Sequence, residues 1–194
     1  RDQTPQHETG RPVSCSDLAQ HLVKSSLGLP PELFELVIGA LLAAGYLAVV
    51  RDQTELVPIE QVATPLSGSV QFVARPPLMP PTQWQMLSRV ARVLLDMALP
   101  GPEHGAQVRV WRRLVATRAE HLQTVAELRR ALEAHMEALG QREAHWRQML
   151  GVLDDLVRCL SCIRPELHPA IGLGEFINDV TDYLKEEQGT IRLG

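Results

Sequence analysis

Apolar residues recur three and four positions apart through the second half of the chain, from Trp84 to Leu184. This spacing places side chains on one face of an α-helix and does not match the two-residue alternation of a β-strand. Aromatic residues make up only 4% of the chain, so the core must consist mainly of Leu, Val and Ala, which favour helix packing. The sequence therefore predicts a mainly α fold in which residues 82–194 form an elongated antiparallel helical bundle or coiled coil.

Four helices are expected within this bundle. Thr82 is expected to cap the first, and Pro165 and Pro169 are expected to break the chain before the last. The second is much longer than its neighbours, so we expect the first and third to lie against its opposite ends. The expected helical ranges are 83–99, 107–139, 141–163 and 174–189.

Gly140 leaves two arrangements open for the two longest helices. A glycine directly after Leu139 commonly ends a helix, and a tight turn there would make the two helices antiparallel. Without such a turn, residues 107–163 would form one helix about 85 Å long. We favour the turn.

The N-terminal part of the chain shows the order of elements found in a winged helix. Ser14 or Ser16 can cap a first helix, the prolines of LPPE suit the first positions of a second helix, and Gly45 suits its end. The segments YLAVVRD and TELVPIE predict a β-hairpin, and VQFVA predicts a third strand. The predicted divisions are a flexible segment, 1–12, a winged-helix-like domain, 13–75, and a Pro-rich linker, 76–81.

The second helix of this domain, ELFELVIGALLAA, contains no Lys or Arg, and its only ionisable residues are Glu32 and Glu35. Carboxylates in the first turn would repel a phosphate backbone, so direct reading of DNA by this helix is not expected. Residues 1–75 contain five Lys or Arg against eight Asp or Glu, a net charge of −3. Three interpretations stay open: burial of the helix by its own hairpin and the bundle, which we favour, a protein-binding winged helix, or DNA contact through Lys24 and the wing residue Arg51.

The pair Cys159 and Cys162, in the sequence CLSC, could bind zinc with His168 as a third ligand, or could carry redox chemistry. The pair lies within a leucine-rich helix, and no second CxxC is present to complete a tetrahedral site. We therefore favour structural cysteines and expect no metal or cofactor. An odd count of three cysteines, without a secretory segment, indicates a reduced, cytoplasmic setting.

A basic run, VRVWRRLVATR, contains Trp111 among four arginines and is the main local candidate for nucleic-acid contact. Neighbouring carboxylates, Glu103, Glu120 and Glu127, reduce its positive charge, and the whole chain has a net charge of −4. A solvated helix face is therefore the favoured interpretation. The four arginines are Arg109, Arg112, Arg113 and Arg118.

The sequence carries no catalytic signature, because neither a phosphate-binding loop ending in Gly-Lys nor a Gly-x-Ser-x-Gly elbow occurs. No apolar run reaches the roughly 18 residues that a membrane-spanning helix requires, so no membrane partner is expected. We predict a non-catalytic interaction module whose partner is another protein or another domain of a longer chain, with self-association as an alternative. The chain begins RDQTPQ without Met, and we expect it to be a piece of a longer protein.

The stretch CSDLAQHLVKSSLGLPPELFELVIGALLAAGYLAVV is similar to winged-helix modules in general. More narrowly, GLPPELFELVIGALLAAGYLAVV, followed by QWQMLSRVARVLL and a coiled-coil region, resembles stretches of the very large bacterial ATPases of phage-defence systems of the BREX and phage-growth-limitation type. The resemblance covers residues 14–97 and includes no invariant chemistry. It implies a non-catalytic segment of a protein whose ATP-binding domain lies elsewhere. Because this chain lacks a Walker loop, neither ATPase activity nor any functional residue carries over.

Overall fold

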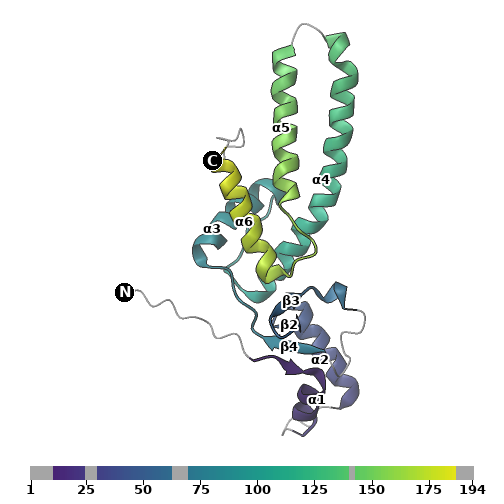
Figure 1. Ribbon diagram of the computed structural model, residues 1–194, viewed down its shortest axis with the longest axis vertical. Helices are drawn as coiled ribbons and strands as arrows, with labels where there is room; N and C mark the ends of the chain where they lie inside the picture. The colour runs from purple at the N-terminus through teal and green to yellow at the C-terminus, as the bar shows by residue number, and fades with distance from the viewer. Residues whose placement is uncertain (1–10, 25–29, 63–69, 140–142, 187–194) are drawn as a thin grey trace, which may run out of the picture. The chain divides into compact units, whose positions relative to one another are not determined.

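The computed structural model describes residues 11–24, 30–62, 70–139 and 143–186. The described chain is mainly helical with a small antiparallel sheet, as the sequence predicts (Figure 1). It divides into two compact units, which we describe separately. The sheet unit comprises residues 1–81, 100–109 and 166–171, and the helical unit comprises residues 82–99, 110–165 and 172–194.

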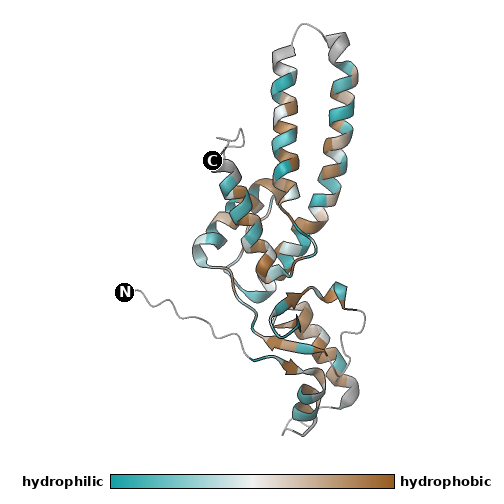
Figure 2. Cartoon of the chain, in the orientation of Figure 1, coloured by the Kyte–Doolittle hydropathy of each residue, from teal (hydrophilic) through white to brown (hydrophobic). Residues whose placement is uncertain are grey.

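Within its described residues, the sheet unit contains four antiparallel strands in the order β1-β4-β2-β3. The predicted hairpin and third strand are present, whereas the two-residue β1 was not foreseen. Along β2 and β4, Val49 lies opposite Phe72 and Ala48 lies opposite Val73, and all four are buried. Apolar residues therefore occupy both faces of the sheet (Figure 2). The strands are β1 (Val13–Ser14), β2 (Leu47–Arg51), β3 (Glu55–Val57) and β4 (Gln71–Ala74).

Helices α1 (Cys15–Lys24) and α2 (Pro31–Ala43) cover one face of this sheet. Ser14 is the cap of α1, because its hydroxyl oxygen accepts the backbone N–H of Asp17 at 3.0 Å and its hydroxyl group donates to the Asp17 carboxylate at 2.7 Å. Helix α2 begins with proline, as expected, because the first N–H groups of a helix have no intrahelical acceptor.

Gly45 ends α2, and two features of its surroundings require a glycine there. Its φ is +76°, and the N–H groups of Gly45 and Tyr46 donate to the carbonyls of Leu42 and Leu41, the paired bonds of a Schellman motif. A Cβ at this position would lie 2.7 Å from a methyl group of Val108 and 2.9 Å from the carbonyl oxygen of His104. Glycine is therefore needed both for the turn and for the close approach of the next segment.

We expect Gly45→Ala to lower the free energy of unfolding by about 2 kcal/mol, because a left-handed φ strains alanine and the added methyl meets a backbone carbonyl. Gly39→Ala is the matched control, since a Cβ at Gly39 would have nothing within 4 Å and alanine is the better helix former by about 0.5–1 kcal/mol. Urea unfolding of both variants measures the two effects. Equal stabilities would contradict this account of Gly45.

In the helical unit, α4 and α5 lie side by side and run antiparallel (Figure 1). The Arg129 guanidinium on α4 contacts the Asp154 carboxylate on α5 at 2.6 Å. The two helices are thus a hairpin and not one continuous helix, although Gly140 itself lies outside the described residues. Residues 104–109 of α4 belong to the sheet unit. The helices are α3 (Pro81–Leu95), α4 (His104–Leu139), α5 (Glu143–Ser161) and α6 (Pro169–Glu186).

Two expected helix boundaries are wrong. Helix α3 begins at Pro81, so Thr82 lies inside it, and it ends at Leu95 because Asp96 adopts a left-handed φ of +47°. Pro169 does not break the chain but is the first residue of α6, where its missing N–H has no cost. In both helices the proline was the true start.

Helix α6 packs beside α3, an arrangement that the sequence did not predict. Gln83 donates to Asn178 at 3.2 Å, and the Thr181 hydroxyl approaches the Met86 sulfur at 3.2 Å. Arg164, just after α5, forms ion pairs of 2.7 Å with both Glu175 and Asp179 of α6. The fully buried side chains of this unit include Leu87, Leu114, Leu160, Leu173, Phe176 and Ile177.

Candidate interaction surface on helix α2

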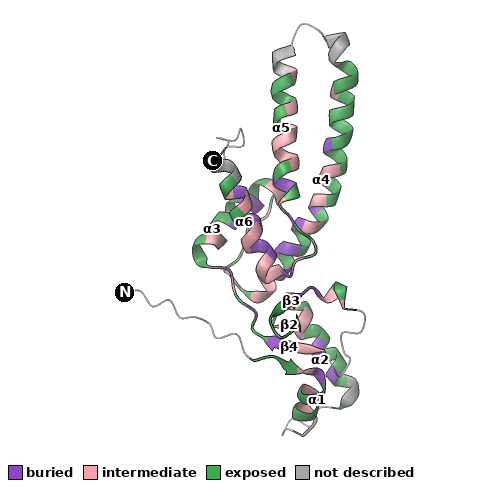
Figure 3. Ribbon diagram, in the orientation of Figure 1, coloured by how far each residue is buried: buried purple, intermediate pink, exposed green. Residues whose placement is uncertain are grey.

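Helix α2 carries two apolar stripes, of which its own unit covers one. Phe34 and Ile38 are buried in the cluster that α1 and α2 form with the sheet. A second stripe, at a spacing of three, four and three residues, is exposed, with Leu33 at 46% and Leu36 at 68% (Figure 3). We call this surface the α2 stripe, and its members are Leu33, Leu36, Ala40 and Ala43.

The exposure of the α2 stripe is unusual for its composition. Apart from Glu32 and Glu35 this helix is apolar, and a helix that is apolar all round is normally buried. The favoured expectation, burial of this helix, is right for Phe34 and Ile38 and wrong for Leu33 and Leu36. The sequence contained the signal, because the stripe follows the same spacing as a coiled-coil seam.

The α2 stripe has small residues at its middle and an exposed carboxylate beside it. Glu35 is exposed beside it, whereas the side chains of Glu32 and Lys24 lie outside the described residues. Gly39 and Ala40 give the middle of the stripe almost no relief, and a Cβ at Gly39 would meet no atom within 4 Å. A second helix could therefore approach this surface closely. The guanidinium of the wing residue Arg51 lies 4.0 Å from the Glu55 carboxylate across the hairpin, so a negative charge opposes its positive charge.

The basic run on α4 is only partly brought together. Arg112 and Arg113 lie three and four residues after Arg109, which places three exposed guanidinium groups on one side of the helix. Arg118 comes nine residues after Arg109, so it lies on the opposite side, and its Nε is buried without a hydrogen-bond partner. Trp111 is 4% exposed and is part of the core. The structure therefore leaves a patch of three arginines without an accessible aromatic ring.

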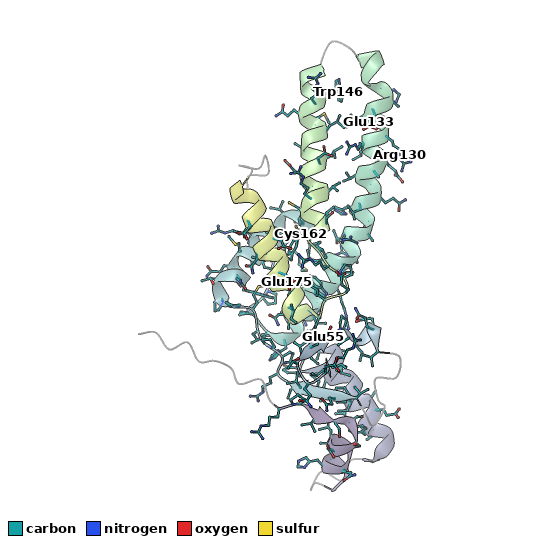
Figure 4. All side chains as sticks on the ribbon, viewed as in Figure 1. Glu55, Arg130, Glu133, Trp146, Cys162 and Glu175 are labelled. Atoms are coloured by element: carbon teal, nitrogen blue, oxygen red, sulfur yellow. The ribbon has the colours of Figure 1, made fainter. Side chains whose placement is uncertain are left out.

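The two cysteines of CLSC are in surroundings that disfavour thiolates. Burial, together with Cys162 and Asp155, raises the pKa of Cys159 to about 11. Burial and Asp179 raise the pKa of Cys162, against the opposing effect of Arg164, and its thiol lies 3.3 Å from the Arg158 carbonyl oxygen (Figure 4). Metal binding and nucleophilic attack both require a thiolate. All three cysteines of the chain are free thiols.

His168 has a structural contact that accounts for its position. It is buried directly before α6, and its Nδ1 accepts the backbone N–H of Ala170 at 3.2 Å, the contact of a helix cap. Burial lowers the pKa of His168 to about 4. Among the described residues, no group of three or more His, Cys, Asp or Glu side chains could hold a metal ion.

A buried glutamine that the sequence did not single out fixes the segment before α3. Gln107 on α4 is 2% exposed, and its side-chain oxygen accepts the backbone N–H of Met79 at 2.6 Å. Its amide group donates to the Pro77 carbonyl at 3.3 Å. In the sequence, Gln107 is recognisable only as a polar residue within an apolar helix pattern, and this pattern does not show which backbone groups its side chain contacts.

Comparison with known protein families, with curated proteins and with solved structures finds no match to this chain. In the part of the chain that the structure describes, no helix is both long enough and apolar enough to cross a membrane. The assignment of function must therefore rest on the surfaces themselves.

Proposed function

We propose that this chain is a non-catalytic interaction module that binds a helix of another protein, or of another domain of the same protein, through the α2 stripe. The observation that carries the proposal is the exposure of Leu33 and Leu36 on a helix whose only ionisable residues are Glu32 and Glu35. Glu35 at the edge of the stripe favours a partner helix that presents Lys or Arg there. The small exposed residues Gly39 and Ala40 suit close helix packing.

The order of elements supports a winged-helix origin for the sheet unit. Two helices precede a β-hairpin, and β1 pairs with β4 to complete the sheet. In this interpretation α2 occupies the place of a reading helix, and its missing basic residues fit a protein partner and not DNA. The resemblance to phage-defence ATPases extends the proposal to a cytoplasmic bacterial assembly whose ATP-binding domain lies elsewhere.

The magnitude of the binding effect follows from the buried area. Fully burying a leucine side chain contributes about 1.5–3 kcal/mol. Because Leu33 and Leu36 are already partly covered, their burial in a complex adds on the order of 2–3 kcal/mol together. Losing about 2–3 kcal/mol corresponds to about a 30- to 150-fold weaker affinity.

We expect Leu33→Ser/Leu36→Ser to weaken the binding of a fluorescent 18-residue helical peptide to the α2 stripe by about 30- to 150-fold. The peptide carries leucines at three- and four-residue spacing flanked by lysines. Fluorescence anisotropy with the full chain measures total binding of the peptide, and the peptide concentration at which hydrogen exchange along α2 slows measures the affinity of the α2 stripe. Val93→Ser is the matched control, because Val93 is an exposed apolar residue, 59% exposed, outside the stripe. Circular dichroism checks that each variant is folded.

Two outcomes would overturn the proposal. One is a peptide that binds without protecting α2, or that protects α2 with the same affinity in the double variant. The other is the rival function: random duplex DNA that binds at physiological salt and is released by Arg112→Ala/Arg113→Ala, since phosphate contacts supply most salt-sensitive affinity. Weak DNA binding seen only at low salt would instead fit the net charge of −4 and support a protein partner.

A further inference from the structure

The α4–α5 hairpin has two flanks of different chemistry. One flank carries the ion pairs of Arg129 with Asp154 at 2.6 Å and with Glu133 at 3.0 Å. Helical spacing places Leu128 of α4, and Met149 and Val152 of α5, on the opposite flank of the antiparallel pair. These three side chains are 49%, 39% and 41% exposed. We call them the hairpin face.

The hairpin face continues a surface that the chain itself covers near the base of the hairpin. Thr117 lies three turns before Leu128 on the same side of α4, and Cys159 lies two turns after Val152 on the same side of α5. Both are buried, at 5% and 6% exposure. The same flank is therefore packed at its base and uncovered further out, where most of α4 is exposed (Figure 3). One more helix laid along it would extend the existing packing.

Charge indicates what kind of helix would fit. Glu120 and Glu127 are exposed, lie two turns apart and border the hairpin face on α4. Arg129 lies on the other flank and is already paired with carboxylates. A second copy of this chain would bring the same glutamates toward each other, whereas a helix with basic edges would meet them with opposite charge.

We propose that the hairpin face binds an amphipathic helix of another protein whose apolar stripe is bordered by Lys or Arg. The surface between Arg118 and His135 of α4 is about 25 Å long at 1.5 Å per residue, which accommodates about 17 residues of partner helix. The hairpin face belongs to a different unit from the α2 stripe, and neither surface requires the other. The two proposals can therefore fail separately.

The test uses the full chain and two synthetic 18-residue helical peptides, one with a leucine stripe flanked by lysines and one with the same stripe flanked by glutamates. Hydrogen exchange is expected to show protection within residues 118–135 and 146–157 with the lysine peptide. Leu128→Ser/Val152→Ser is expected to raise the dissociation constant of this hairpin site at least tenfold. Leu33→Ser/Leu36→Ser, on α2, is the matched control and is expected to leave hairpin protection unchanged.

A charge reversal distinguishes a specific binding site from non-specific hydrophobic binding. Glu120→Lys/Glu127→Lys is expected to switch the preference of the hairpin site from the lysine peptide to the glutamate peptide. Protection that is absent from the hairpin, insensitive to the serine substitutions, or unchanged by the charge reversal would overturn the proposal. So would a dimer of the chain alone, seen by sedimentation and abolished by Leu128→Ser/Val152→Ser, because the occupant would then be a second copy.

Discussion

Replacing Trp111 with alanine is expected to lower the free energy of unfolding of the helical unit by about 3–5 kcal/mol, the usual cost of removing a large buried aromatic side chain. Trp111 is 4% exposed, and its ring fills the space above Gly172 of α6. A Cβ at Gly172 would lie 2.5 Å from two ring atoms of Trp111. The indole is thus in close contact with α6, and its removal would leave a cavity at this contact.

Urea unfolding followed by circular dichroism measures this effect. Because the chain has two compact units, they can unfold in separate transitions, and only the transition of the helical unit is expected to shift. Gly172→Ala is expected to cost about 1–3 kcal/mol from the other side of the same contact, by overpacking. Val93→Ala, at an exposed position of α3, is expected to change stability by less than about 0.5 kcal/mol. A Trp111→Ala protein of normal stability that had lost DNA binding would show that the indole is a surface contact after all.

Local patterns predicted the elements of this fold well. The spacing of Leu, Val and Ala marked the helices, and the β-branched segments around Asp52 marked the hairpin. Glycine at position 45 correctly marked a helix end. These predictions succeed because each depends on backbone preferences within a few residues.

Contacts between distant segments could not be obtained in this way. Strand β1 pairs with β4 across most of the sheet unit, and Gln107 serves the backbone of residues 77 and 79. Trp111 illustrates the same difficulty, because its place among arginines suggested a contact surface, whereas its side of α4 is buried against α6. The pattern of one helix does not say what covers each of its sides.

The two candidate surfaces show what the sequence can and cannot predict. The absence of Lys and Arg from α2 was enough to argue against DNA reading. Whether Leu36 is inside or outside depends on how much of α2 the sheet covers, which is a property of tertiary packing. For the same reason the hairpin face emerges only when α4 and α5 are seen as an antiparallel pair.

Lowering the pH from 6.5 to about 4 is expected to destabilise the protein by up to about 3 kcal/mol through His168. Burial lowers the pKa of this imidazole from 6.5 to about 4 in the folded state. Between these pH values the unfolded chain binds a proton that the folded chain does not. The contribution of the uncharged His168 to the free energy of unfolding is therefore fully present above pH 6.5 and declines as the pH falls. Each unit of pKa difference corresponds to about 1.4 kcal/mol. Protonation also removes the Nδ1 acceptor that caps α6.

His168→Asn isolates this effect from the carboxylates that titrate in the same range. Asparagine is a good helix cap and can accept the N–H of Ala170, but it carries no proton in this window. The unfolding free energy of the variant, measured by urea at several pH values, is therefore expected to fall less steeply between pH 6.5 and 4 than that of the natural chain. Identical slopes would mean that His168 has the same pKa in the folded and unfolded protein, which would contradict its burial as an uncharged cap.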